Sequence, residues 1–282
     1  MELASLEIRI ARNENLPVLS QAVSTVLRLV DNPNISSRNI ENAIEKDPAI
    51  TAKVLKVANS AYYGGMDIPS VGRAVQFLGL NTIRSLVVGI ALQQMISDRT
   101  VTPNFSKLEF WSHCLAVATA ARILCRMKLP FKAEELYCAG MMHDVGMLVM
   151  DRFMSREFQS ALDLCRESGR PLYEIEREIQ GYDHAEIGGL LATNWSLSKI
   201  IMHGIRYHHD PALDGDFYET TCVIAVADAV AHQCGYTNNV NNAVYEIDEE
   251  AAEAIGLKTE QLDTIKTVVI SEVNRAQEAF RI

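Results

Sequence analysis

The 282-residue sequence has little positive charge and lacks long apolar runs. Its 26 Lys and Arg residues stand against 36 Asp and Glu residues, so the formal net charge is −10 at pH 7. A field of that sign repels phosphate backbones, and we expect no binding to nucleic acid. No stretch reaches the roughly 18 uninterrupted apolar residues that a membrane-spanning helix needs, so we expect no membrane contact. The first 17 residues lack a basic segment followed by an apolar one, so we expect no secretory signal and a cytoplasmic protein.

Glycine, proline and paired cysteines are also scarce. The 15 Gly and 8 Pro residues are too few for a collagenous or disordered chain. The six cysteines form no C-x-x-C pair, and in a chain of this length we expect them to be reduced thiols in the core: Cys114, Cys125, Cys138, Cys165, Cys222 and Cys234.

Apolar residues recur at spacings of three and four along almost the whole chain, which is the pattern of amphipathic helices. One such stripe runs from Val18 to Val30 and is broken at 31–34. Further helical patterns occur at about 108–128, 132–151, 155–168, 171–180, 183–195, 197–209, 218–234 and 247–281, the last interrupted at Gly256. No alternating strand pattern with a hairpin turn accompanies them, so the predicted fold class is all-α.

A polar stretch at 97–107 separates two helical parts. It reads SDRTVTPNFSK and contains a proline. The stretch predicts a boundary at about residue 100, with one helical unit over 1–100 and another over 101–282.

The sequence contains seven histidines, none before residue 113, and His143 is directly followed by Asp144. Both lie in a strongly apolar segment that we expect to be helical. A buried carboxylate is costly unless it is paired or bound to a metal, although a backbone donor or an arginine can satisfy it equally. Upstream lies His113, and Asp228 is another lone carboxylate in an apolar helix. Together these four residues can supply three or four nitrogen and oxygen ligands to one divalent ion.

Three further histidines, His184, His208 and His209, extend this set. With Asp144 as a bridge they can hold a second ion, and two-ion sites orient a phosphate and activate water. We expect the other two, His203 and His232, to be exposed or hydrogen-bonded residues of the fold, although His232 lies one turn after the Asp228 carboxylate.

Ordered motifs along the chain resemble the HDOD family, whose members are signal-output proteins related to the HD-domain metal phosphohydrolases. The resemblance covers about residues 16–210, and its motifs are Leu16-Pro17, Glu45–Thr51, Val57–Tyr63, Ala74–Gly79, Phe110–His113, Met142–Gly146, His184–Gly188 and His208–Pro211. It implies an all-helical fold in which an N-terminal helical subdomain packs on an HD-like helical core. It also implies a bacterial signalling protein. Because the sequence shows no receiver, GGDEF or EAL module, we expect a stand-alone HDOD protein.

The resemblance also implies a set of metal ligands. His113, His143, Asp144 and Asp228 match the four single-metal positions of the wider HD superfamily. The additional positions of the two-metal HD-GYP phosphodiesterases are matched by His184, His208 and His209. One or two divalent ions are therefore implied, and His/Asp ligation suits Fe, Mn, Zn or Ni almost equally well.

Two departures from the active relatives argue against catalysis. Those relatives carry a lysine after H-D-x-G that can contact a phosphate, and this chain has Met147 there. The G-Y-P element expected after the paired histidines is absent, and Asp210, Asp214 and Asp216 make that loop acidic, which disfavours an anionic cyclic dinucleotide. We therefore expect a regulatory protein that binds a signalling protein partner or a small nucleotide-like ligand. The alternatives are an active metal-dependent phosphohydrolase on a nucleotide or cyclic nucleotide, and a scaffold without metal.

Overall fold

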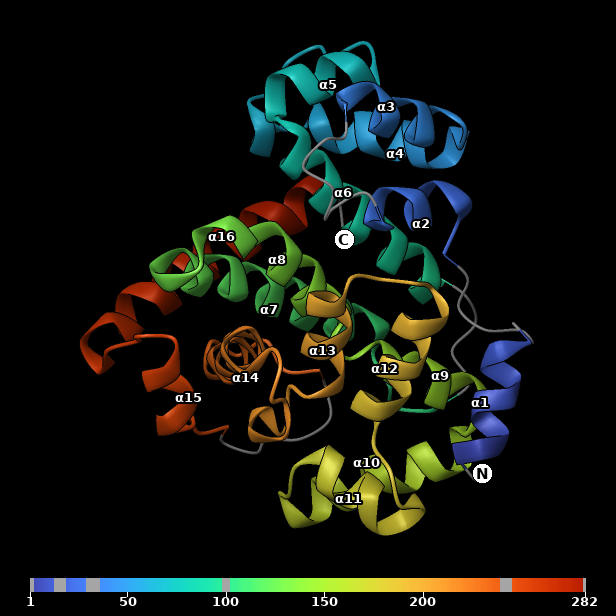
Figure 1. Cartoon of the computed structure of the whole chain (residues 1–282), viewed down its shortest axis with the longest axis vertical. Coiled ribbons are helices and arrows are strands. Elements are labelled where there is room, and N and C mark those ends of the chain that lie inside the picture. The colour runs from blue at the N-terminus through green and yellow to red at the C-terminus, as the bar shows by residue number, and fades with distance from the viewer. Residues whose placement is uncertain (1–2, 13–18, 29–35, 98–101, 239–244, 281–282) are drawn as a thin grey trace.

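Every regular element in the described part of the chain is a helix (Figure 1). The computed structural model describes residues 3–12, 19–28, 36–97, 102–238 and 245–280, and no strand occurs in these ranges. The predicted all-α class is confirmed.

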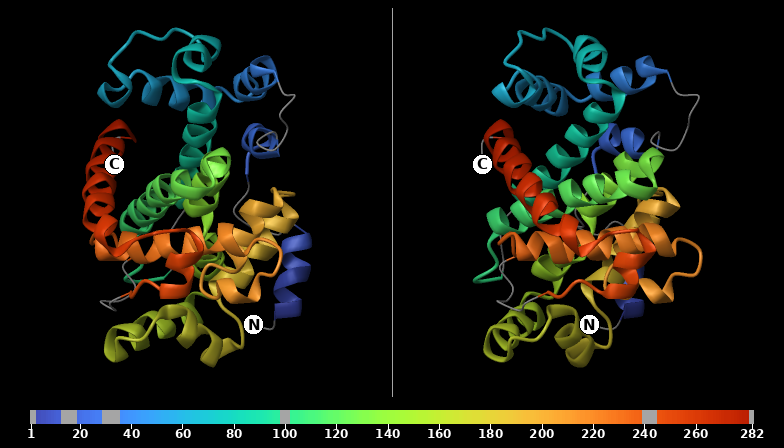
Figure 2. Two further views of the ribbon diagram at one scale, coloured as in Figure 1. Left: turned by 60° about the vertical axis from the view of Figure 1, so that its left-hand side comes forward. Right: turned by 90° about the vertical axis from the view of Figure 1, so that its left-hand side faces the viewer.

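The N-terminal helices form a layer around the first half of one long helix, α6 (Figure 2). Helices α2, α4 and α5 pack against α6, which runs out of this layer into the rest of the molecule, whereas α1 lies apart and contacts α12 (His184–Asn194). In chain order the elements are α1 (Leu3–Ala11), α2 (Gln21–Arg28), α3 (Ser37–Glu45), α4 (Pro48–Ala58), the short 3₁₀ segment η1 (Ala61–Tyr63), α5 (Val71–Leu78) and α6 (Leu80–Ser97).

The other helices surround α7 and α14, which pack against each other. Helix α7 also contacts α8 and α16, while α12 packs on α9 and α13. These elements are α7 (Lys107–Lys128), η2 (Pro130–Lys132), α8 (Ala133–Met142), α9 (Val145–Phe153), α10 (Ser155–Ser168), α11 (Leu172–Gln180), α12, α13 (Lys199–Arg206), η3 (Pro211–Leu213), α14 (Tyr218–Gln233), α15 (Glu249–Ala254), η4 (Thr259–Gln261) and α16 (Leu262–Phe280).

Helices α7 and α8 approach each other closely because Gly140 faces Ala118. A Cβ atom at residue 140 would lie 2.9 Å from the Ala118 Cα atom, which is closer than real Cβ contacts come. This approach places His113 of α7 beside His143 at the end of α8, with their Nε2 atoms 3.2 Å apart.

Two predicted helices end earlier than the sequence pattern indicates. The pattern at 132–151 forms two helices, α8 and α9, with a break at His143 and Asp144, so the single helix predicted there is wrong. The pattern at 197–209 ends as a helix at Arg206, before the paired histidines. Almost all of α8 and α9 is buried, so the apolar pattern continues across the break and does not reveal it.

The predicted break at 31–34 and residues 98–101 of the predicted boundary lie outside the described residues. The division into 1–100 and 101–282 therefore stays a prediction. Asp47 and Pro48 begin α4, where the Asp47 side chain accepts hydrogen bonds from the backbone N–H groups of Ala49 and Ile50.

The six cysteines are free, and all except Cys234 are buried, as predicted. Among the described residues, no single helix has both the length and the apolarity to cross a bilayer. One pair, Val71–Leu78 with Leu80–Ile96, meets the length and composition criteria jointly, but the two helices are bent by 119°.

Candidate metal centre

A two-residue turn between α8 and α9 carries His143 and Asp144 into the centre of the molecule. Asp144 departs from helical geometry with φ −93° and ψ 10°, and its carbonyl oxygen accepts a hydrogen bond of 2.9 Å from the backbone N–H of Met147. Gly146 allows α12 to approach this turn, because a Cβ atom there would lie 1.9 Å from the His184 carbonyl oxygen. The turn and the N-terminus of α12 are thereby brought together.

The Asp144 carboxylate lies at the middle of the cluster and is buried. Its Oδ1 atom lies 3.2 Å from His143 Nε2, 3.1 Å from His184 Nε2 and 3.6 Å from His208 Nε2. Its Oδ2 atom lies 3.5 Å from His113 Nε2. One carboxylate thus contacts four imidazoles that come from separate parts of the chain.

Backbone carbonyl groups orient three of these rings. In each ring the Nδ1 atom lies 2.8 Å from a carbonyl oxygen, in the pairs His113 with Tyr236, His143 with Gly140 and His208 with Ile205. Because a carbonyl only accepts, Nδ1 is the protonated nitrogen, and in the neutral ring Nε2 keeps its lone pair. All three Nε2 atoms are therefore prepared to act as ligands.

The fourth ring, His184, is held by a carboxylate that no sequence motif marks. Glu176 Oε2 lies 2.7 Å from His184 Nδ1 and accepts a hydrogen bond of 2.8 Å from the His184 backbone N–H. Glu176 is fully buried. Its place one turn after Leu172, on the inner face of α11, was the only signal that the sequence offered for it.

One group of candidate ligands consists of His113, His143 and Asp228, all buried. Asp228 Oδ1 lies 3.2 Å from His113 Nε2 and 3.9 Å from His143 Nε2. The two Nε2 atoms face each other at 3.2 Å, so their lone pairs repel unless a proton or a cation lies between them.

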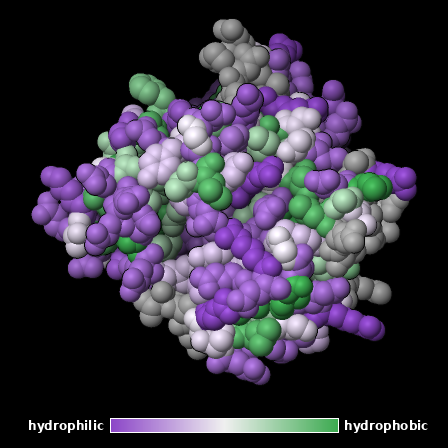
Figure 3. Space-filling view, turned by 60° about the horizontal axis from the view of Figure 1, so that its bottom comes forward, coloured by the Kyte–Doolittle hydropathy of each residue, from purple (hydrophilic) through white to green (hydrophobic). Residues whose placement is uncertain are grey.

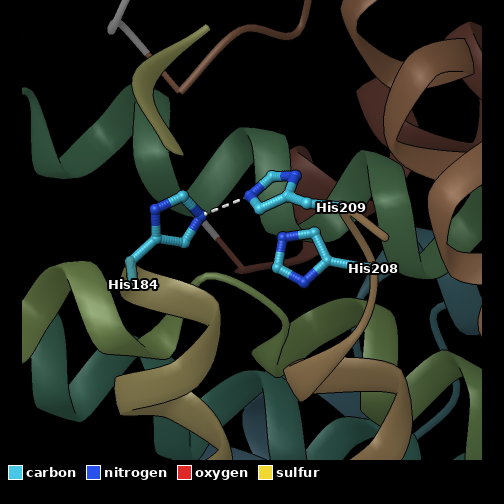
Figure 4. Close-up of side chains that lie close together, drawn as sticks. All are labelled: His184, His208 and His209. Carbon is cyan, nitrogen blue, oxygen red and sulfur yellow. Dashed lines mark hydrogen bonds between the residues drawn. The ribbon is translucent and has the colours of Figure 1, made fainter. Parts of the chain in front are cut away.

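The second group consists of His184, His208 and His209, which point toward one another in Figure 4. His184 begins α12, whereas the other two follow α13 in the loop before η3. His209 Nε2 lies 2.9 Å from His184 Nε2, and the His209 ring stacks on Tyr173 with centroids 4.1 Å apart.

The donor atoms fit a divalent ion. His208 Nε2 and Asp228 Oδ1 are buried and have no hydrogen-bond partner among the described residues. Such atoms lose their hydration without compensation unless a cation takes the place of water. Within each group the ligand atoms lie within 4.8 Å of one another, and a third group joins Asp144 to His143 and His208. Imidazole nitrogens with carboxylate oxygens suit Zn, Fe, Ni or Mn.

The electrostatics of the cluster centre on Asp144 and His184. Burial alone would raise the pKa of Asp144, but the nearby His143, His184 and His208 rings outweigh it and hold that pKa well below its usual value. Burial alone would lower the pKa of His184, but Glu176 and Asp144 raise it well above its usual value.

The pKa values of His113 and His209 are shifted in opposite directions. Burial would lower the pKa of His113, yet Asp228 and Asp144 raise it. Burial lowers the pKa of His209 well below its usual value, and the neighbouring His208 and other histidine charges lower it further. Protons and a metal ion compete for the same imidazole nitrogens, so metal binding at this cluster depends on pH.

A pocket of about 220 Å³ reaches the cluster beside His208, His209 and Asp228. Glu246 and Asp248 also line it. In the view from the side of α10 and α11, the surface is mainly hydrophilic with small, scattered hydrophobic patches (Figure 3).

Among the described residues, no lysine or arginine lines this pocket. Arg177 pairs with Asp183 and Asp210. Met147, at the position where a lysine was expected in active relatives, is fully buried and lies 3.9 Å (Sδ) from Asn238 Nδ2. An anionic substrate would therefore meet mostly acidic side chains at this pocket.

The structure brings together all seven residues predicted as ligands: His113, His143, Asp144, His184, His208, His209 and Asp228. His232, which we expected to be exposed or hydrogen-bonded in the fold, is buried, with Nε2 3.4 Å from Asp228 Oδ1 and its ring stacked on Tyr245. Asn238, which donates to Asp144 Oδ2 at 2.9 Å, was not anticipated because it follows α14 in an irregular segment.

The solved structures that share this fold include three from different bacteria. The chain matches an HDOD domain protein of unknown function from Geobacter sulfurreducens with a TM-score of 0.80 and 22% identity, over 99% of this chain and 100% of that one. It matches a candidate phosphohydrolase from Shewanella amazonensis with a TM-score of 0.74 and 23% identity, over 99% and 97%. A candidate signal transduction protein from Marinobacter aquaeolei gives a TM-score of 0.81 and 21% identity, over 99% of this chain and 64% of that one.

A sequence relative and a family model complete the comparison. An uncharacterized protein of Treponema pallidum (strain Nichols) is 26% identical over 205 residues, which is 71% of this chain but 38% of the length of that relative. The family model of the HDOD domain matches residues 16–211, close to the range indicated by the sequence motifs. The chain therefore belongs to the HDOD domain family.

Proposed function

We propose that this chain is a regulatory HDOD protein that holds one or two divalent metal ions and acts by binding a signalling partner or a small ligand. The observation that carries the proposal is the convergence of seven His and Asp side chains on one cluster, whose pocket is lined by no lysine or arginine of the described residues. The centre has the donors of a metal site, whereas its mouth lacks the charge that binds phosphate.

The candidate ligands form two groups, one for each ion position. His113, His143 and Asp228 would hold one ion, His184, His208 and His209 the other, and Asp144 lies between the groups. A divalent ion there supplies Lewis acidity and makes water more acidic. Backbone carbonyl groups and Glu176 direct the Nε2 atoms of four of these rings at the centre: His113, His143, His184 and His208.

The electrostatics of the pocket favour a binding role over phosphoester turnover. Glu246 and Asp248 line the approach, Arg177 is neutralised by two carboxylates, and Met147 offers no charge. The protein side chains at this pocket offer a phosphate carboxylates rather than cations, whereas phosphoryl-transfer sites use side-chain cations as well as metal ions to stabilise developing charge.

A second candidate function is metal-dependent phosphohydrolysis. One observation favours it: Asp144 contacts histidines of both groups, as a carboxylate shared by two ions would. In this alternative the ions replace the missing lysine as the positive charge that receives the phosphate.

An assay of phosphomonoesters and phosphodiesters with added Mn²⁺ or Fe²⁺ separates the two candidates. We expect the wild-type protein to release no more product than the Asp144→Asn variant. Turnover at about 1 per second or faster, abolished by Asp144→Asn but not by Asp263→Asn on the exposed surface of α16, would overturn the regulatory proposal.

A further inference from the structure

A second polar pocket lies between the N-terminal layer and the rest of the molecule. It has a volume of about 310 Å³ and shares no lining residue with the metal centre. Tyr62 and Tyr63 of η1 line it together with Tyr137 of α8, Arg122 and Arg126 of α7, and Glu272 of α16. Figure 2 shows the C-terminal end of α16 rising toward the N-terminal layer. We call this cavity the tyrosine pocket.

Three aromatic rings give the tyrosine pocket flat surfaces. Tyr62 and Tyr63 meet edge to face, with centroids 4.5 Å apart and ring planes at 84°. The Arg122 guanidinium lies 3.9 Å above the Tyr137 ring centroid. Because Tyr137 is buried beneath Arg122, the half-buried Tyr62 and Tyr63 rings and the Arg122 plane are the surfaces on which a planar ligand can stack.

The hydrogen bonds of the pocket leave donors available. Arg122 Nη2 donates to Ser85 Oγ at 2.9 Å and lies 3.4 Å from Glu134 Oε2, but its Nε atom is buried without a hydrogen-bond partner among the described residues. Arg126 lines the pocket, is exposed and makes no ion pair within the described ranges. The Tyr62 hydroxyl donates to Glu272 Oε2 at 2.9 Å, and burial together with Glu272 raises its pKa to about 12, so it stays neutral.

The charge balance of the tyrosine pocket opposes that of the whole chain. Three arginines surround it, namely Arg122, Arg126 and Arg275, whose guanidinium lies 5.1 Å above the Tyr62 ring. Two carboxylates, Glu134 and Glu272, face them. The pocket therefore carries a local positive excess in a chain of net charge −10, which selects anions at this place on the surface.

We propose that the tyrosine pocket binds a small planar anion, of which a nucleoside monophosphate is the matching class, with the base on the tyrosine rings and the phosphate at Arg122 and Arg126. A volume of about 310 Å³ lies at the lower end of the range for small-molecule sites, so it suits one base and one phosphate rather than a dinucleotide. The inference rests on the proposed function only in treating the protein as a binding module, and it requires no metal.

Calorimetric titration of the full chain with AMP, GMP, adenosine and inorganic phosphate tests this proposal. We expect one monophosphate per chain, with adenosine and inorganic phosphate at least about tenfold weaker, because each lacks one of the two recognised parts. Arg126→Ala should weaken monophosphate binding about tenfold or more, as expected for loss of a charge-assisted contact. The matched variant Arg38→Ala, an exposed arginine on α3, should leave binding unchanged.

Two further variants keep the outcome decisive. Ile123→Trp fills the pocket from α7 and should abolish binding, while thermal melting verifies that the variant is folded. Asp144→Asn should leave monophosphate binding intact, so failure of the metal centre and failure of the tyrosine pocket are distinguishable. Absence of binding at millimolar monophosphate, or binding that survives both Arg126→Ala and Ile123→Trp, would overturn the proposal. Loss with Asp144→Asn and not with Arg126→Ala would also overturn it, since the ligand would then lie at the metal centre.

Trp111 provides an independent readout of occupancy. Its ring packs on Phe280, with centroids 5.2 Å apart, and Phe280 lines the tyrosine pocket. In a Trp195→Phe background Trp111 is the only tryptophan. In the Trp195→Phe variant, the Trp111 emission should change on addition of AMP or GMP. In the double variant Trp195→Phe, Arg126→Ala, the emission should stay constant.

Discussion

The candidate metal centre and the tyrosine pocket both involve helices α7 and α8 but present side chains of opposite charge. His113 and Arg122 are both on α7, nine residues apart, which is two and a half turns and places them on opposite faces. Buried carboxylates and oriented Nε2 atoms prepare one face for cations, whereas three arginines and three tyrosines prepare the other for a planar anion. Residues on opposite faces of α7 therefore contribute to two sites of different charge.

The largest expected effect comes from the close approach that builds the metal centre. Gly146→Ala would place a Cβ atom 1.9 Å from the His184 carbonyl oxygen, and backbone cannot yield as a flexible side chain does. We expect a loss of about 3 kcal/mol or more in the free energy of unfolding, measured by denaturant titration.

The matched control is Gly215→Ala, because a Cβ atom there meets nothing within 4 Å. It should change stability by less than about 0.5 kcal/mol. Equal stability of the Gly146→Ala variant and the wild type would contradict the packing of α9 on α12.

Metal removal should affect one site and spare the other. A chelator should lower the melting temperature of metal-loaded wild type by about 5 °C, since an ion at 100 times its Kd adds about 2.7 kcal/mol. The Arg126→Ala variant should show the same shift because its side chain lies in the tyrosine pocket. A chelator shift that persisted in Asp144→Asn would place the ion elsewhere.

A smaller effect distinguishes the tyrosine pocket from the open surface. Tyr62→Phe removes the hydroxyl that donates to Glu272 in a half-buried setting, and should cost about 1 kcal/mol. Tyr236→Phe removes an exposed hydrogen bond to Asn274 and should cost less. Comparison of the two unfolding curves measures the difference, and a larger loss in Tyr236→Phe would show that the pocket contact is not the stronger one.

The smallest effect concerns thiol chemistry in the core that both sites share. Burial raises the pKa of Cys138 and of Cys165 to about 12, so almost none of either thiol is ionised at pH 8. A colorimetric disulfide reagent should modify the partly exposed Cys234 first and the five buried thiols only after unfolding. Rapid modification of several thiols in the native protein would show that the core opens readily.

Helical periodicity was sufficient to predict the fold class, and residue chemistry was sufficient to select seven side chains that the structure brings together. Apolar spacing shows helices wherever one face is buried. A carboxylate beside a histidine in an apolar segment is costly to bury unless it is paired or bound to a metal. The break at His143 and Asp144 was not predictable, because α8 and α9 are buried on almost every side and present no polar face to mark it.

Long-range contacts were the other limit. Glu176 supports His184 only because α11 folds back on the start of α12, and its sequence context is that of an ordinary helical glutamate. In the tyrosine pocket Tyr62 contacts Glu272, which is 210 residues away in the sequence. No local sequence pattern predicts such a contact. Such sites depend on helix packing, which periodicity alone does not specify.

The most direct test of the account is the metal content of protein purified without chelator or metal-affinity resin. Elemental analysis should find one or two ions per chain in the wild type and in Arg126→Ala. It should find almost none in Asp144→Asn. Absence of metal in all three after reconstitution with Fe²⁺, Mn²⁺ and Zn²⁺, or equal metal in all three, would contradict a metal centre at Asp144.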